Sequence, residues 1–540
     1  MAPDSFQEAQ PEKNSAPRPA EWLGLFLMLG GLLLLNLLTY NLYPQVWSDE
    51  VWFSEPAVNY VTEGDFHARS FMFVPVHGFP YINCPLYLMV QIPWLAITGT
   101  SVLGIRSFNY TLMAVAAFLI WVVSWRFKLV RTPSARLLLV LLLHLGYGMS
   151  YAYRCSRPDI LGMVCLSLLL LSFTVSDRRW RAAGLLFFSA VTFWIGLQVA
   201  LFAGFACFLG LLVLRLVRFS EFLVVSVGLA CGAASLAVFL WWKGVLASFV
   251  PQIVGQLGKR YAHDTLPIGT KIHRVLGNVL VSYMDEFSTD LIIAGIALVL
   301  LVNWKKLSPG IRALNAYCLI LVFGVPFLFD IAGHWAFYYS YLRFVPASLA
   351  LFATIGELTQ APIGQRRAWV KPFWLATVGA AIMVGLPMRL ALSVSRCHLP
   401  PRSEMLQTLR AGIHPGDVAL SDQALFFETR QVTTEVYTRF STAGLFHSFA
   451  KGGHDFSPEE KASISVLVIR PQDAKITTNY LGGGWVAEGP PFGESQDFGV
   501  LTRLPIVGGR FASYSLQLQN ERYPLQIFRR APEATGAKPQ

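Results

Sequence analysis

The sequence predicts an all-α polytopic membrane protein with a small water-soluble α/β domain at its C-terminal end. Hydrophobic residues make up 54% of the 540 residues and charged residues only 14%, which lies outside the usual range of soluble globular proteins. The mean hydropathy is +0.49. Apolar runs of the ~20 residues that a helix needs to cross a bilayer recur from residue 22 to residue 395. Beyond residue 395 the composition becomes polar, so we expect a separate domain there.

Helices placed on the apolar runs give about eleven transmembrane spans. The first, at 22–40, lacks the small-residue cleavage site of a signal peptide, so we expect it to be retained. The segment 1–21 is rich in Pro, Glu, Gln and Ala, which predicts a disordered cytoplasmic tail. The transmembrane domain then covers 22–395, with its other spans at 104–125, 135–152, 158–175, 182–197, 199–216, 222–242, 288–304, 312–329, 340–358 and 372–395.

Basic residues predict the orientation of the chain. They gather in short loops between alternate spans, and Lys and Arg concentrate in cytoplasmic loops. An odd number of spans with a cytoplasmic N-terminus therefore places the domain at 396–540 outside. The net charge of +11 does not predict nucleic-acid binding, because no basic stripe is interleaved with exposed aromatic residues. The clusters are Arg126, Lys128, Arg131 and Arg136; Arg178, Arg179 and Arg181; Arg215 and Arg218; Lys305 and Lys306; and Arg366, Arg367 and Lys371.

Two of the predicted outer loops are long, at 41–103 and 243–287. The first contains an apolar run at 85–97 that is short and interrupted by Pro93, so we expect a helix lying at the membrane interface. Three cysteines face the outer compartment in this topology, Cys84, Cys155 and Cys397, and a disulfide between Cys84 and Cys155 could join two of the loops.

The region 396–540 has the pattern of a small α/β domain. A polar helix is predicted at 403–411, and strands are predicted at 417–421, 465–469 and 525–528, with Gly and Pro between them. The sequence contains no Gly-rich phosphate loop and no zinc-binding spacing.

The candidate functional residues are acids at the mouth of the predicted bundle. An acid in or near lipid needs water, a partner or a metal. Asp49 and Glu50 closely follow the first span, and Asp159 begins the fourth span within Arg157-Pro158-Asp159. An acid in the first turn of a helix also complements the helix dipole, so Asp159 could serve only as a cap.

The order of these features resembles one family of membrane enzymes. The Asp-Glu pair of the first outer loop is followed by Thr62-Glu63-Gly64-Asp65, a Pro-Leu-Tyr helix, Arg106 and Arg-Pro-Asp, and later by Tyr341-Leu342-Arg343-Phe344-Val345-Pro346. Over roughly residues 20–360 the chain resembles glycosyltransferases of the GT-C fold, close to the protein O-mannosyltransferases and the bacterial aminoarabinose transferases.

The resemblance implies a reaction and a location. Such enzymes transfer a sugar from a polyprenyl phosphate to a lipid, glycan or protein acceptor on the non-cytoplasmic face, with inversion at the anomeric carbon. It places this chain in a bacterial inner membrane among lipids, and makes Asp49 the general base. Asp159 matches a position that holds a divalent metal ion (Mg, Mn or Zn) or positions the donor. The role of Glu50, catalytic or acceptor-positioning, stays open.

One departure concerns the donor phosphate. The aminoarabinose transferases carry a Lys in the first loop, where this chain has Tyr81-Ile82-Asn83-Cys84-Pro85-Leu86-Tyr87. Arg343, Lys259 or Arg260 could replace it, because a guanidinium group or an ammonium group pairs with phosphate.

Residues 333–339 form a short aromatic outer loop. Trp and Tyr at headgroup level account for it as an interfacial belt, while His334 and Tyr338 could also contact the acceptor.

Two other functions use the same lipid substrates. A transporter or flippase for lipid-linked saccharides would place ionisable residues at mid-bilayer, whereas here the charges gather at span ends and in outer loops. An oligosaccharide polymerase or ligase would carry a long Arg-rich outer loop, which 243–287 matches only in part.

Overall fold

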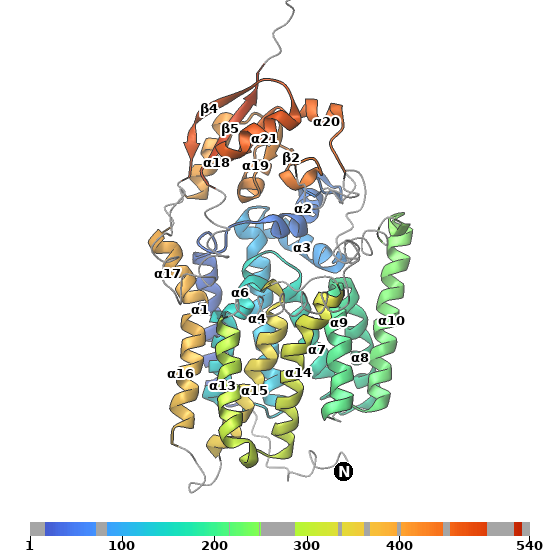
Figure 1. Cartoon of the computed structure of the whole chain (residues 1–540). Helices are drawn as coiled ribbons and strands as arrows, with labels where there is room; N and C mark the ends of the chain where they lie inside the picture. Colours follow the sequence, from blue (N-terminus) through green and yellow to red (C-terminus); the bar gives the residue numbers. More distant parts are fainter. Residues whose placement is uncertain are drawn as a thin grey trace, which may run out of the picture.

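The protein is a helical bundle with a second, mixed α/β domain seated on one end (Figure 1). This computed structural model describes residues 17–71, 84–214, 217–247, 249, 287–332, 337–360, 368–396, 401–445, 454–493 and 523–531. The bundle is built from long helices that run roughly parallel to one another, and two shorter helices, α2 and α3, lie between the bundle and the second domain (Figure 1). The fold predicted from the apolar runs is confirmed.

The helices of the first half of the bundle region alternate long spans with short segments. Proline opens α1, α3 and α5, where its missing N–H costs no hydrogen bond. The elements are α1 (Pro19–Leu38), α2 (Ser48–Glu63), α3 (Pro85–Thr98), α4 (Val102–Arg126), α5 (Pro133–Leu145), α6 (Tyr147–Arg154), α7 (Asp159–Ser172), α8 (Arg178–Ile195), α9 (Leu197–Leu209), the π-helical turn η2 (Gly210–Leu214) and α10 (Phe219–Trp242).

The second half of the bundle is α13 (Phe287–Asn303), η3 (Trp304–Lys306), α14 (Pro309–Ala332), η4 (Phe337–Tyr339), α15 (Tyr341–Gln360), α16 (Val370–Met383) and α17 (Leu386–Arg396). Buried apolar side chains from α1, α4, α5, α7 and α13 to α16 form one large core. Burial of this core within the bundle holds the spans in a fixed arrangement.

The number of membrane crossings stays a prediction. Seven described helices are long and apolar enough to cross a membrane, and eight if α5 and α6, which meet at a 60° bend, form one broken span. Of the other helices that cover predicted spans, α7 and α9 are shorter apolar segments. The bend lies at Gly146, where the ring of Phe344 leaves no room for a Cβ. Each predicted apolar run is helical, but length and composition do not establish eleven crossings.

The described part of the first outer loop contains one helix that was not predicted. The apolar run at 85–97 folds as α3, as expected, but the segment after Asp49 also forms a helix, α2. The disulfide considered for Cys84 and Cys155 is absent, because both are buried free thiols. Each sulfur packs in a different hydrophobic cluster, Cys84 with Tyr87 and Phe108.

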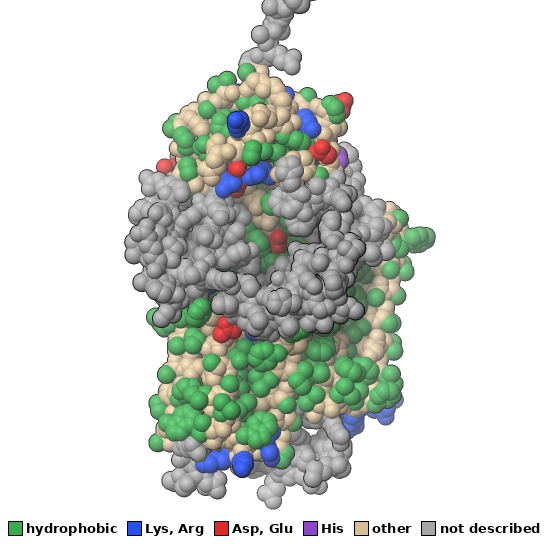
Figure 2. All heavy atoms as spheres, in the orientation of Figure 1, with side chains coloured by type: hydrophobic (Ala, Val, Ile, Leu, Met, Phe, Trp, Pro, Cys, Tyr) green, Lys and Arg blue, Asp and Glu red, His purple; other side chains and the backbone are tan. Residues whose placement is uncertain are grey.

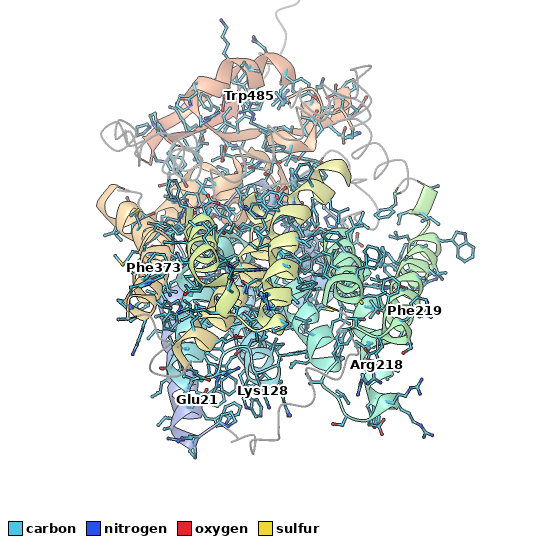
Figure 3. All side chains as sticks on the ribbon, turned by 60° about the horizontal axis from the view of Figure 1, so that its bottom comes forward. Glu21, Lys128, Arg218, Phe219, Phe373 and Trp485 are labelled. Carbon is cyan, nitrogen blue, oxygen red and sulfur yellow. The ribbon has the colours of Figure 1, made fainter. Side chains whose placement is uncertain are left out.

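Basic residues gather at the end of the bundle opposite the second domain. Figure 2 shows Lys and Arg side chains at the lower end, below a broad hydrophobic band. Glu21, Lys128 and Arg218 lie at this end and Trp485 at the other (Figure 3). The start of α1 is fixed there by Arg136, whose Nε and Nη2 donate to the two carboxylate oxygens of Glu21 at 2.7 Å each. The predicted basic loops that are described therefore share one end of the bundle with the start of α1.

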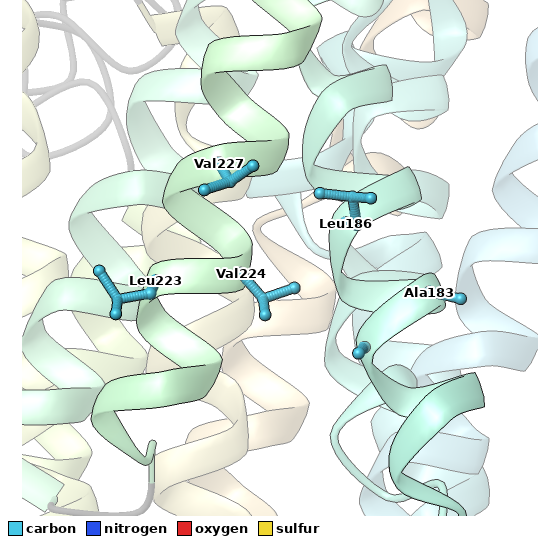
Figure 4. A pocket seen from close by; sticks show the side chains of 6 residues that line it. Ala183, Leu186, Leu223, Val224 and Val227 are labelled. Carbon is cyan, nitrogen blue, oxygen red and sulfur yellow. The ribbon is translucent and has the colours of Figure 1, made fainter.

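Close packing of α8 and α10 depends on small residues. Gly228 and Gly232 of α10 face Ser189 and the carbonyl oxygen of Ala190 with no room for a Cβ. Toward their N-terminal ends, the two helices diverge and leave a shallow apolar groove on the outer surface (Figure 4). It is lined by Ala182, Ala183, Leu186, Leu223, Val224 and Val227.

The second domain contains a five-stranded sheet of order β2-β1-β3-β5-β4. The first three of these strands are parallel, whereas β5 runs antiparallel to both β3 and β4. The elements are α18 (Arg402–Gly412), β1 (Val418–Ser421), η6 (Gln423–Leu425), α19 (Phe426–Arg430), β2 (Glu435–Tyr437), η7 (Arg439–Ser441), α20 (Pro458–Ser463), β3 (Val466–Ile469), α21 (Pro471–Leu481), β4 (Trp485–Phe492) and β5 (Leu525–Arg530). The predicted helix at 403–411 and the three predicted strands correspond to α18, β1, β3 and β5.

This domain shares a core with the first outer loop. Val51 and Val58 of α2 pack in one buried cluster with Phe426, Phe427 and Val436 of the second domain. Polar contacts surround this cluster: Nη2 of Arg430 donates to Oδ1 of Asn59 at 2.8 Å and pairs with Glu63, and Thr438 Oγ1 donates to the carbonyl of Ser70 at 2.8 Å. The helix that carries Asp49 is therefore held on one side by the second domain.

The buried contacts of Arg430 lead to a prediction about docking. Arg430→Ala removes the guanidinium that donates to Asn59 and pairs with Glu63, at a cost of roughly 1.5–3 kcal/mol for hydrogen bonds to a charged group. We expect faster hydrogen exchange of the α2 amides, measured by mass spectrometry in detergent. The matched control, Arg410→Ala on the exposed face of α18, should leave exchange unchanged. Equal exchange in both variants would contradict this account of docking.

Candidate active site

The acidic pair is presented by the first turn of α2. The chain leaves α1 at Leu38 and starts α2 at Ser48, with Trp47 as the residue before the helix. Carboxylates in this turn complement the helix dipole. Successive residues of an α-helix point about 100° apart, so Asp49 and Glu50 face different surroundings.

Glu50 is fully buried in an ion pair with Arg106 of α4. Nε and Nη2 of Arg106 donate to Oε1 and Oε2 of Glu50 at 2.7 Å each. The same guanidinium donates to the carbonyls of Tyr40 and Pro44, at 2.6 and 2.8 Å. The backbone N–H of Ser156 also donates to Glu50 Oε1, at 3.2 Å. Through these contacts Glu50 connects four segments: α2, α4, the turn that follows α1, and the segment that precedes α7. This supports a structural role for Glu50, which holds these segments together.

Asp49 and Asp159 are brought together by Arg157. Nε of Arg157 donates to Oδ2 of Asp159 at 2.7 Å, and Nη1 pairs with Oδ2 of Asp49. The side chains of Arg157 and Asp159 are 2% and 0% exposed, whereas that of Asp49 is 14% exposed. Asp49 is therefore the carboxylate that a substrate can reach.

Aromatic rings surround the guanidinium of Arg157. Its carbon lies 3.9 Å from the ring centroid of Tyr338, 5.3 Å from that of Phe53 and 5.6 Å from that of Trp47. Rings in this arrangement attract a cation and exclude water. Tyr338, the predicted acceptor contact, thus lies at the same site as the acidic residues.

Burial sets the acidity of Asp49. Loss of water raises the pKa of its carboxyl above the usual aspartate value, and the nearby charge of Asp159 raises it further. Arg157 opposes this rise by attraction and hydrogen bonding, and the Ser48 hydroxyl helps, but the pKa remains raised. A carboxylate with a raised pKa is a stronger proton acceptor, which is what a general base requires.

A buried polar network holds the backbone that carries Arg157. Nδ2 of Asn109 donates to the carbonyls of Cys155 and Arg157, at 2.6 and 2.9 Å. The hydroxyl of Ser156 contacts the hydroxyl of Tyr87 at 2.7 Å and accepts from Nε2 of Gln91 at 2.8 Å. α3 and α4 therefore fix the position of this segment.

The other predicted site residues lie elsewhere or outside the described part of the chain. Arg343 is fully buried in α15, and its Nε donates to the carbonyl of Val322 at 3.0 Å. Lys259, Arg260 and His334 fall outside the described residues. Of the residues predicted to bind the donor phosphate or the acceptor, the structure therefore describes two. Tyr338 lies at the acidic cluster, and Arg343 lies within the bundle.

The acidic cluster does not fit a divalent metal ion in this arrangement. Among the described residues, no group of three or more His, Cys, Asp or Glu side chains could hold a metal. Asp49 and Asp159 each have one oxygen directed at Arg157, so the guanidinium stands between them.

Arg157 is the site residue to which sequence reasoning assigned no role. In the sequence it stands within the tripeptide Arg157-Pro158-Asp159, of which only Asp159 was predicted to be functional. Pro158 precedes α7, and Asp159 is the first residue of that helix. Its carboxylate lies in the first turn as a cap would, and it also binds Arg157.

The buried Glu50–Arg106 pair predicts a large effect on stability. Glu50→Gln leaves the guanidinium of Arg106 buried with no counter-charge, which costs roughly 3–5 kcal/mol. We expect a marked fall in the free energy of unfolding, measured by thermal or denaturant unfolding in detergent. The double variant Glu50→Gln/Arg106→Met should lose less than the sum of the single variants. Additive losses would show that the pair is not coupled.

Comparisons with known proteins show the fold. No protein-family model matches the chain, and no curated protein matches it in sequence. ArnT from Cupriavidus metallidurans, solved with bound undecaprenyl phosphate, is similar with a TM-score of 0.57 and 12% identity, over 97% of this chain and 100% of ArnT. The arabinofuranosyltransferase AftD from mycobacteria is similar with a TM-score of 0.51 and 15% identity, over 96% of this chain and 40% of AftD. The chain therefore has the GT-C fold of membrane glycosyltransferases.

Proposed function

We propose that this chain is a membrane glycosyltransferase that takes a sugar from a polyprenyl phosphate donor. The observation that carries the proposal is the pair Asp49 and Asp159, at the end of the bundle that faces the second domain, with Asp49 partly exposed. The fold is shared with ArnT, which was solved with undecaprenyl phosphate. A donor anchored in the bilayer would bring its phosphate to the end of the bundle, where these acids lie.

The chemistry assigned to Asp49 is general-base catalysis. The acceptor, a hydroxyl or amine of a glycan, lipid or protein, attacks the anomeric carbon and passes its proton to the Asp49 carboxylate. The bond between the anomeric carbon and the donor phosphate oxygen breaks, and its electron pair leaves with the phosphate. Attack from the side opposite the phosphate inverts the configuration. Asp159 positions the donor through Arg157, and Tyr338 contacts the acceptor.

We also propose an orientation in the membrane. The basic loops and the start of α1 share one end of the bundle (Figure 3), and Lys and Arg favour cytoplasmic loops. This supports a cytoplasmic N-terminus and a second domain on the outer face of a bacterial inner membrane. The active site would then lie beneath that domain, on the outer side, where the acceptor is found.

Substitution of the base tests the proposed function. Asp49→Asn keeps the size of the side chain but cannot accept the proton, so we expect sugar transfer to fall by about 10²–10⁴-fold. Transfer is measured with a radiolabelled polyprenyl phosphate sugar and the purified chain in proteoliposomes. Asp65→Asn is the matched control, because Asp65 is 78% exposed in the same loop. Unchanged turnover in Asp49→Asn would remove the assignment, and donor movement between leaflets without transfer would favour a flippase.

The pH dependence gives a separate test. Asp49 must be ionised to act, so activity should fall as the pH drops through its raised pKa, above the ~3.9 of an ordinary aspartate. Arg157→Gln removes the attraction that opposes the rise, so the acidic limb of kcat/KM should move to higher pH. A limb that stays in place or moves to lower pH in this variant would contradict the assignment of Asp49.

A further inference from the structure

Arg157 differs from the neighbouring buried arginines in what it binds. Arg106 and Arg154 are tied to structural partners: Arg106 to Glu50 and two carbonyls, and Arg154 to Asn36, Thr39 and the carbonyl of Tyr43. Arg157 instead binds the two carboxylates of the candidate active site. Its interactions are therefore with groups that a substrate would approach.

One donor of the Arg157 guanidinium has no hydrogen-bond partner in the part of the chain that the structure describes. Nε and Nη1 are engaged by Asp159 and Asp49, while Nη2 makes no hydrogen bond to any described residue. The backbone of Arg157 is held by Asn109, and one face of its guanidinium packs on Tyr338. The group is thus fixed in position but can still accept a further anion.

The charges around Arg157 are unbalanced. Two carboxylates share one guanidinium, and the more exposed of the two, Asp49, competes with any incoming anion for Nη1. An arginine binds phosphate through two parallel N–H donors, which here would be Nη1 and Nη2. A bound phosphate would therefore take the donor that Asp49 holds in the resting chain.

We propose that Arg157 is the phosphate-binding residue and a latch on the base: the donor phosphate draws its guanidinium from Asp49 and so frees the carboxylate. The latch rests on the proposed function and adds a regulation of its site. Asp49 is held by a cation while the site is empty and becomes a stronger base only when the donor is present. Asp159 keeps its hydrogen bond from Nε of Arg157 throughout. The Arg157 side chain therefore pivots about this bond and does not leave the site.

Equilibrium binding of undecaprenyl phosphate tests the latch without turnover. The full-length chain in nanodiscs is titrated with the radiolabelled lipid, and undecaprenol, which lacks the phosphate, is the control ligand. Arg157→Gln should weaken binding of undecaprenyl phosphate at least tenfold, and Arg157→Lys should weaken it less. Binding of undecaprenol should be equal in all variants.

The competition between Asp49 and the phosphate for Nη1 of Arg157 gives a test that is more specific to the latch. Asp49→Asn removes the competitor for Nη1, so binding of undecaprenyl phosphate should strengthen several-fold. In the Arg157→Gln background, Asp49→Asn should give no gain, because there is no guanidinium to release. This comparison separates the latch from the general effect of removing one negative charge.

The outcomes also separate the latch from the proposed function. If the wild-type chain fails to bind undecaprenyl phosphate, the proposed function itself is overturned. If the wild type binds but Arg157→Gln binds equally well, or Asp49→Asn gives no gain, the latch is overturned and the proposed function stands. A gain that persists in the double variant likewise overturns the latch. If Arg157→Gln does not fold, Arg157→Lys replaces it in the comparison, and the absence of a gain in Asp49→Asn still overturns the latch.

Discussion

The ion pair between Glu50 and Arg106 is the constraint on which the site depends. It lies in the interior with both side chains fully buried, where charges are tolerated only when they are paired and hydrogen-bonded. Because Arg106 also binds the turn after α1, and Glu50 also binds the backbone of Ser156, one pair fixes four segments. Asp49 precedes Glu50 and Arg157 follows Ser156, so the same pair sets the distance between the proposed base and its cation.

The second domain constrains the site from the other side. Its apolar side chains pack in one buried cluster with Val51 and Val58 of α2, and Arg430 holds the far end of that helix. Trp52 also stacks edge-on with Phe440, with ring centroids 5.3 Å apart. A helix clamped between two domains holds the orientation of Asp49 more tightly than a free loop could. This gives the C-terminal domain a mechanical role, whatever else it binds.

Much of the fold could be predicted from composition because the membrane imposes a simple rule. A long apolar run must be a helix in lipid, so α4 and α10 were predicted close to their observed ends. The second domain was harder: β4 contains Gly489, Pro490 and Pro491, which break a strand pattern, and β2 has only three residues. α2 was missed as a helix because its stability comes from packing against both domains, not from its own periodicity.

The candidate site could be predicted only in part. The acids were found because charge beside a membrane is costly, and the resemblance to a family separated Asp49 from Glu50. The role of Arg157 depends on contacts between residues about a hundred positions apart, which no local pattern encodes. The bracing role of Glu50 has the same origin, since its partner Arg106 lies in another helix.

The most direct test of the account is an experimental structure of the full chain with undecaprenyl phosphate bound. We expect the phosphate beside Arg157, with the guanidinium turned from Asp49 and the carboxylate open toward the second domain. A phosphate bound away from Arg157, or a prenyl chain confined to the apolar groove between α8 and α10 (Figure 4), would contradict it.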